Sequence, residues 1–184
     1  MNRWRSFPLA VPLFAVALAL PAWAGALWVD VPFVAQPEEG CGAAVISMVM
    51  QYWDLQGGRE PRPASEVDGI QKALYSRKDR GISSNAMQGY FQANGFRVMA
   101  YRGDWDHLYR QIERGRPPIV ALAPAGPRAS LHYAVLAGID AERNFVFLND
   151  PARGKLLRLS REAFETEWKA VDHWTLLALP LPSN

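Results

Sequence analysis

One stretch constrains the fold more than any other. The only cysteine of the chain, Cys41, stands between two glycines, where a turn-forming segment becomes a helix-forming one. The residues after it carry apolar side chains at i, i+3, i+4, i+7 and i+8, the pattern of one buried helical face: Val45, Met48, Val49, Tyr52 and Trp53. We predict a buried helix from about Cys41 to Trp53, ended by Gly57 and Gly58. The thiol then lies at a helix N-terminus, where unpaired N–H groups and the helix dipole favour the thiolate.

The first 24 residues have the pattern of a secretory signal peptide. Arg3 and Arg5 give a basic start, residues 7–20 are apolar, and Ala22-Trp23-Ala24 has the small-x-small form of a cleavage site. The apolar run is shorter than the roughly 20 residues of a membrane-spanning helix. No cysteine follows the cleavage site, which argues against a lipoprotein anchor. We expect cleavage after Ala24 and a periplasmic or secreted protein.

Residues 25–184 are expected to form one domain. Loss of Arg3 and Arg5 removes no acidic residue, so the formal net charge falls from +2 to zero. Binding to nucleic acid or to an anionic membrane needs a clustered basic excess, and we expect neither partner. No later segment is long and apolar enough to span a bilayer, so we expect no stable membrane insertion. The oligomeric state is left open.

Cys41 has two interpretations. Most lone cysteines are small buried apolar residues that do no chemistry. In an oxidising compartment, however, an unpaired thiol is an oxidation liability, and a single cysteine cannot form an internal disulfide. This favours a chemical role. Gln36 lies five residues upstream and reaches the same spot if the glycines fold the chain back, which would place a carboxamide donor beside the thiol.

The rest of the chain predicts an α+β fold of two lobes, a helical N-terminal lobe packed on an antiparallel β-sheet C-terminal lobe. A strand over residues 26–34 is expected to enter the core. Three further helices follow: Ser65 to Tyr75, Ser83 or Ser84 to Ala93, and a helix capped by Asp104. A short strand over residues 96–101 lies between the last two helices. The second half is strand-rich, and a short helix capped by Ser160 precedes its last strand. The predicted strands cover residues 118–123, 131–139, 145–148, 155–159 and 173–179. A cleft between two lobes is a usual place for a site.

A cysteine nucleophile needs a base, a group that orients the base and donors for the oxyanion. Of three histidines, His107 is most simply a surface residue at an acidic helix start, and His173 has no obvious partner. His132 differs because it opens a strand after the loop at 126–130, where it is well placed as a general base.

Asp150 ends the neighbouring predicted strand. If the two strands pair antiparallel through the turn at 140–144, Asp150 and His132 lie near each other at the same end of the sheet. The carboxylate would then fix the tautomer of the imidazole. The alternative is that Asp150 only starts a turn before Pro151, as aspartate often does.

Four motifs stand in order along most of the chain: Gln36 with Cys41-Gly42, His132-Tyr133-Ala134-Val135-Leu136, Asn149-Asp150-Pro151-Ala152-Arg153-Gly154, and Phe164-Glu165-Thr166-Glu167-Trp168. Together they resemble the bacteriocin-processing, or double-glycine leader, peptidases, which are papain-like cysteine peptidases. The resemblance implies a papain-like fold with Cys41 as nucleophile, His132 as base and Asp150 as its orienter. It also implies Gln36 as oxyanion donor, together with the backbone N–H of Cys41, and chemistry that uses no metal or cofactor.

The chain departs from the family pattern in two respects. Gly40 stands where many members have an acidic residue, and the transport ATPase joined to many members has no counterpart, so we expect a free-standing exported member. The implied function is an exported cysteine endopeptidase that cleaves another exported protein, with Gly-Gly as the cleavage site that the family suggests. Two alternatives stay open: a catalytically inactive papain-like module that binds peptides or assists secretion, and a cell-wall peptide amidase. Leu55-Gln56-Gly57-Gly58 resembles a double-glycine site, but we interpret it as a helix stop.

Overall fold

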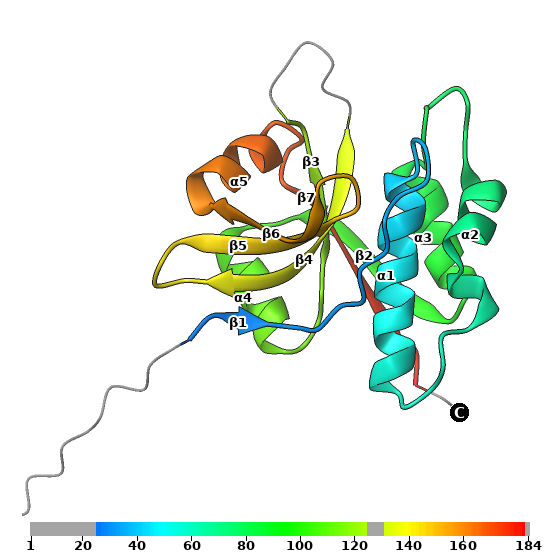
Figure 1. The fold of residues 1–184 in the computed structure, drawn as a ribbon, viewed down its shortest axis with the longest axis horizontal. Helices are drawn as coiled ribbons and strands as arrows, with labels where there is room; N and C mark the ends of the chain where they lie inside the picture. Colours follow the sequence, from blue (N-terminus) through cyan, green and yellow to red (C-terminus); the bar gives the residue numbers. More distant parts are fainter. Residues whose placement is uncertain (1–24, 125–130, 183–184) are drawn as a thin grey trace, which may run out of the picture.

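The computed structural model describes residues 25–124 and 131–182 (Figure 1). The predicted signal peptide and the loop at 126–130 lie outside this part of the chain. A group of helices stands beside a twisted antiparallel sheet, so the predicted α+β class is confirmed. Among the described residues, no helix combines the length and the apolar character needed to cross a membrane.

The central helix of the fold is α1 (Cys41–Gln56), which stands between the sheet and two further helices, α2 (Val67–Leu74) and α3 (Ser84–Ala93) (Figure 1). Nearly all of its residues from Gly42 to Met50 are fully buried, as expected of a helix that is apolar around most of its circumference. Two aromatic side chains of α1 also bond to the backbone of the other lobe: the Tyr52 hydroxyl to Gly115 O at 2.7 Å and Trp53 Nε1 to Ala178 O at 3.0 Å.

A buried carboxylate closes the far end of the helical lobe. Asp54, which is 1% exposed, accepts hydrogen bonds from the guanidinium and the backbone N–H of Arg62. Arg62 Nη1 donates in turn to Asn94 O at the end of α3, at 3.1 Å. Because both partners of the ion pair are hydrogen-bonded, the burial of Asp54 is compensated. The pair holds the end of α1, the loop before α2 and the end of α3 together.

The sheet has the strand order β2-β7-β3-β4-β5-β6, and β1 pairs with the far part of β4. Its seven strands run antiparallel to their neighbours: β1 (Leu27–Trp28), β2 (Phe96–Arg102), β3 (Ile119–Leu122), β4 (His132–Asp140), β5 (Phe145–Asp150), β6 (Gly154–Ser160) and β7 (Trp174–Pro180). Two helices pack against it: α4 (Trp105–Glu113) contacts β4 and β1, and α5 (Arg161–Lys169) contacts β3, β5 and β6.

Three predicted helix starts are confirmed by their caps. The side chains of Ser83, Asp104 and Ser160 accept hydrogen bonds from the N–H groups three residues later, as helix-capping residues do. The helix start predicted at Ser65 is wrong. Ser65 belongs to a 3₁₀ turn (Pro63–Ser65), and its hydroxyl donates to Arg62 O, while α2 begins after Glu66.

Two other expectations need correction. The strand expected over 26–34 is only two residues long, because the chain turns locally after it: Val31 N donates to Val29 O at 2.9 Å instead of to a neighbouring strand. From Val29 the chain continues as an arm across the sheet, bonded to it at Ala137 O by Val29 N. The helical and sheet halves also mix, since α4 packs on the sheet and β2 forms one of its edges beside β7.

The arm depends on one buried side chain, that of Asn149. Its Nδ2 donates to Val31 O at 2.9 Å, and its Oδ1 accepts from Leu156 N at 3.1 Å. Asn149→Ala leaves both backbone groups without these partners, so we expect a loss of about 2 kcal/mol in the free energy of unfolding. Urea denaturation measures this loss, and Asn85→Ala, at an exposed position of α3, is the control with little expected change. Equal stability of the two variants would contradict the role given to Asn149.

Candidate active site

Cys41 begins α1, and the glycines on both sides of it are explained by close contacts. Gly40 closes a turn with its N–H bonded to Pro37 O at 2.9 Å, and a Cβ added at Gly40 would lie only 2.5 Å from Pro37 Cγ. A Cβ at Gly42 would lie 2.8 Å from the Cβ of Ile82. The absence of side chains at these two positions lets the turn and the segment before α3 approach the start of the helix. The thiol therefore stands at a helix N-terminus, as predicted.

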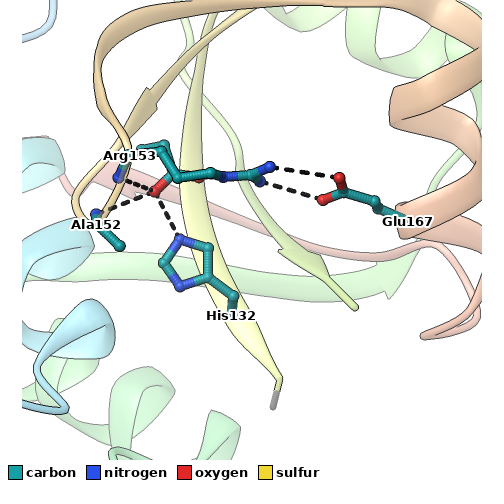
Figure 2. A network of polar contacts seen from close by, with 5 residues as sticks. His132, Ala152, Arg153 and Glu167 are labelled. Atoms are coloured by element: carbon teal, nitrogen blue, oxygen red, sulfur yellow. Dashed lines mark hydrogen bonds and ion pairs between the residues drawn. The ribbon is translucent and has the colours of Figure 1, made fainter. Parts of the chain in front are cut away.

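His132 and Asp150 lie together, at the start of β4 and the end of β5. The two strands form an antiparallel hairpin, in which Val135 pairs with Asn149. Nε2 of His132 is 2.8 Å from Oδ1 of Asp150, a carboxylate with no exposed side-chain surface (Figure 2). Asp150 also caps a turn, since Oδ1 accepts from the N–H groups of Ala152 and Arg153. Both interpretations of Asp150 in the sequence are thus compatible.

The surroundings of this pair favour its charged form. Burial alone would raise the pKa of Asp150, but the hydrogen bond with His132 and the contact with Arg153 outweigh it and lower the pKa to about 2. Burial alone would lower the pKa of His132. The hydrogen bond to Asp150, together with the nearby Cys41 side chain, outweighs it and raises the pKa to about 9. At neutral pH the arrangement therefore holds an imidazolium against a carboxylate.

Cys41 and His132 line one groove, with a cavity volume of about 600 Å³. One wall comes from the end of the arm and the start of α1, with Gln36, Glu39 and Cys41. The rest of the lining comes from the start of β4, residues 131–133, and from residues 79–84. Because Nε2 of His132 is taken by Asp150, Nδ1 is the ring nitrogen left to exchange a proton with the thiol.

Gln36 reaches the groove on the arm. Its backbone N–H donates to Pro151 O at 3.1 Å, which fixes the arm beside the turn that Asp150 caps. Its side chain lines the groove, and its Oε1 is buried without a hydrogen-bond partner among the described residues. Such an atom costs free energy unless a ligand or water satisfies it, so the amide is suited to contact a substrate.

The sequence did not point to Glu39 as part of the site. Glu39 has a positive φ of 52°, and its carboxylate accepts hydrogen bonds from the Tyr75 hydroxyl and from Arg80 Nε and Nη2 at 2.9 and 2.8 Å. The bonds from Tyr75 and then Arg80 lower the pKa of Glu39. They join the turn before Cys41 to the segment that closes the groove. The acidic residues before Cys41 and the basic link at 77–80 were visible in the sequence, but nothing there pairs residues 41 positions apart.

The other two histidines do not line the groove. His107 is exposed and pairs with Asp104, with Nδ1 2.6 Å from Oδ2, as expected of a surface residue. His173, for which the sequence offered no partner, lies 3.3 Å from Glu165 and packs edge-on against Trp168. Within residues 25–124 and 131–182, no group of three or more His, Cys, Asp or Glu side chains is arranged to bind a metal ion.

The comparison with family models decides the family. The model of the Peptidase_C39 like family matches residues 28–175, most of the chain. The chain belongs to this family. It is accordingly a cysteine peptidase, and the resemblance seen in its motifs is confirmed. A comparison with curated proteins found no match.

Solved structures support the fold of this peptidase. The peptidase domain of Streptococcus ComA, a bi-functional ABC transporter, is 23% identical, with a TM-score of 0.61 over 80% of this chain and 97% of that one. A double glycine motif protease from an AMS/PCAT transporter, in complex with the leader peptide, is 20% identical, with a TM-score of 0.63 over 86% and 96%. The peptidase domain of Streptococcus mutans ComA is 21% identical, with a TM-score of 0.56 over 80% and 98%. The predicted papain-like fold is thereby confirmed.

The pKa of His132 predicts how the stability of the peptidase depends on pH. A raised pKa in the folded state stabilises the fold below the unfolded value of about 6.5, and this contribution is lost as the pH rises through about 9. Asp150→Asn removes the carboxylate, so its free energy of unfolding should fall less between pH 6 and pH 10, by on the order of 2 kcal/mol. Denaturant unfolding across this range measures the difference, with Asp104→Asn as the control. The same pH dependence in Asp150→Asn and the unmodified protein would refute the coupling.

Proposed function

We propose that the protein is an exported cysteine endopeptidase that hydrolyses peptide bonds in another exported protein. Cys41 is the nucleophile, His132 the general base and acid, Asp150 the orienter of His132, and Gln36 an oxyanion donor. The observation that carries the proposal is the 2.8 Å hydrogen bond between His132 Nε2 and the buried Asp150, beside the groove that Cys41 and Gln36 also line. The family supplies the reaction class, and this geometry supports a role for each residue.

In the proposed acylation step, Nδ1 of His132 holds the proton of the Cys41 thiol. The thiolate forms an S–C bond to the substrate carbonyl carbon, and the carbonyl oxygen takes up the displaced electron pair. The imidazolium then donates its proton to the leaving nitrogen as the C–N bond breaks, which releases the first product and leaves a thioester on Cys41. Asp150 keeps the ring oriented and stabilises its positive charge during both transfers.

In the deacylation step, His132 takes a proton from water as the water oxygen attacks the thioester carbonyl. Collapse of this second intermediate breaks the C–S bond, and the thiolate leaves with the imidazolium beside it. In both steps the oxyanion would be met by the Gln36 amide and by the backbone N–H of Cys41, which has no intrahelical acceptor at the first position of α1. No metal or cofactor takes part in either step.

The proposed substrate is a peptide segment cleaved after a Gly-Gly pair in a partner that is itself exported. The similar double glycine motif protease in complex with a leader peptide supports peptide binding in a fold of this kind. The signal-peptide pattern of residues 1–24 supports export of the chain, and with it a periplasmic or secreted site of action.

Cys41→Ala tests the proposal most simply. The variant should fold with an unchanged melting temperature. It should show no turnover of peptides that contain Gly-Gly and lose labelling by iodoacetamide, because it has no thiolate to attack the peptide carbonyl carbon or the methylene carbon of the reagent. Turnover is measured by mass spectrometry on a panel of such peptides, with Asn85→Ala, at an exposed position of α3, as a control that keeps the thiol. A Cys41→Ala protein that still cleaves the panel would end the proposal.

Gln36→Ala tests the oxyanion contact separately. Loss of one such donor typically costs about 10²–10³-fold in kcat, so kcat should fall by this amount while KM changes little. Steady-state kinetics give both constants, and Gln92→Ala, at an exposed position of α3, provides the matched control. An unchanged kcat in Gln36→Ala would mean that the oxyanion is bound by other groups.

A further inference from the structure

The carboxylate of Asp150 is held from two sides. Oδ1 meets His132 and the two backbone N–H groups of the turn. Oδ2 is directed away from them and accepts from Arg153 Nε at 2.6 Å. The guanidinium therefore fixes the rotation of the carboxylate. Contacts to Oδ1 alone would constrain this rotation less.

Arg153 is itself held from a different element. Its Nη1 and Nη2 lie 3.3 and 3.1 Å from the two carboxylate oxygens of Glu167 on α5 (Figure 2). The side chains of Arg153 and Glu167 are only 32% and 18% exposed, so solvent screens this pair incompletely. The backbone of Glu167 is anchored as well, because its carbonyl accepts from Ala123 N, just after β3, at 3.0 Å. A row of alternating charges thus runs from the groove to α5: His132, Asp150, Arg153 and Glu167.

We propose that Arg153 and Glu167 are positioning residues for the site formed by Cys41, His132 and Asp150. Arg153 fixes the orientation of the Asp150 carboxylate, and Glu167 offsets the charge of Arg153 so that Asp150 still stabilises the imidazolium. The catalytic meaning of this role rests on the proposed function. The electrostatic effect on His132 does not, and it is measurable without a substrate.

The signs of the two charge effects on His132 are opposite. The guanidinium of Arg153 repels the imidazolium, so its removal should raise the pKa of His132. The carboxylate of Glu167 attracts the imidazolium, so its neutralisation should lower this pKa. A unit charge roughly 10 Å away, in surroundings between those of water and of a protein interior, shifts a pKa by about half a unit to one unit.

Other charges also face His132. Cys41 faces it from α1. Tyr133 is the next residue of β4, and burial raises the pKa of its phenol to about 12, so that it is neutral at neutral pH. Glu39, Asp79 and Arg80 line the same groove. Arg80 pairs with Glu39 and is 80% exposed, so solvent screens this rim more than the interior behind Asp150. None of these groups changes in the variants described next.

The test is an NMR titration of the His132 imidazole in the full mature chain. In Glu167→Gln, which keeps an acceptor for Arg153, the pKa of His132 should fall by about half a unit. In Arg153→Met it should rise by a similar amount, and kcat should fall because the carboxylate is freer to rotate. Arg153→Lys keeps the charge, so the pKa should stay near that of the unmodified protein.

The matched control is Arg143→Met. Arg143 follows Asp140 by three residues and bonds to it through the backbone N–H and the guanidinium, as Arg153 does with Asp150, but at the other end of β4 and β5. This control should leave the pKa of His132 unchanged. If Glu167→Gln and Arg153→Met also leave it unchanged while both proteins remain folded, Arg153 and Glu167 only join α5 to the turn, and the inference fails.

The two proposals fail in different ways. A folded protein that cleaves no peptide but shows the expected pKa shifts contradicts the proposed function alone. The positioning role alone is contradicted if the peptidase is active but Glu167→Gln and Arg153→Met have the same His132 pKa, and the same pH dependence of kcat/KM, as the unmodified protein.

Discussion

The site depends on the hydrogen bonds that the buried carboxylate of Asp150 receives. A charged group with no exposed side-chain surface is tolerated only when its hydrogen bonds are satisfied, and Asp150 receives them from His132, from two backbone N–H groups and from Arg153. These partners come from the start of β4 and from the turn after β5. Through Arg153 the network also reaches α5. One carboxylate therefore fixes the imidazole and the end of the hairpin at the same time.

The groove also requires that the helical lobe is held in one position relative to the sheet. The segment at 149–151 provides this, since Asn149 and Pro151 hold the arm that leads to Gln36 and Cys41, and Asp150 holds His132. Three successive residues thus bind the arm on one side and the proposed base on the other. The contacts of Tyr52 and Trp53 with the sheet lobe then fix the direction of α1 behind the thiol.

Much of this arrangement could be predicted from the sequence because its signals are local. The glycines around Cys41, the caps at Ser83, Asp104 and Ser160, and the hairpin that brings residues 132 and 150 together are all readable within a few residues or one turn. The family motifs added the expected role of each residue, and those roles stay predictions until they are measured.

What could not be predicted depends on packing between distant elements. Glu167 meets Arg153 only because α5 packs on the sheet beside the turn, and Glu39 meets Arg80 only because Gly42 lets residue 82 approach α1. The short length of β1 follows from the local bond between Val31 N and Val29 O, which takes these groups out of the ladder.

The most direct test of the proposed mechanism is a crystal structure of residues 25–184 after reaction with a short peptide aldehyde ending in Gly-Gly. The account predicts a covalent bond between Cys41 Sγ and the former aldehyde carbon. Its oxygen should lie about 2.7–3.1 Å from the Gln36 amide nitrogen and the Cys41 backbone nitrogen, with Nδ1 of His132 facing the sulfur. An unmodified Cys41, or an adduct with His132 turned away from the sulfur, would contradict it.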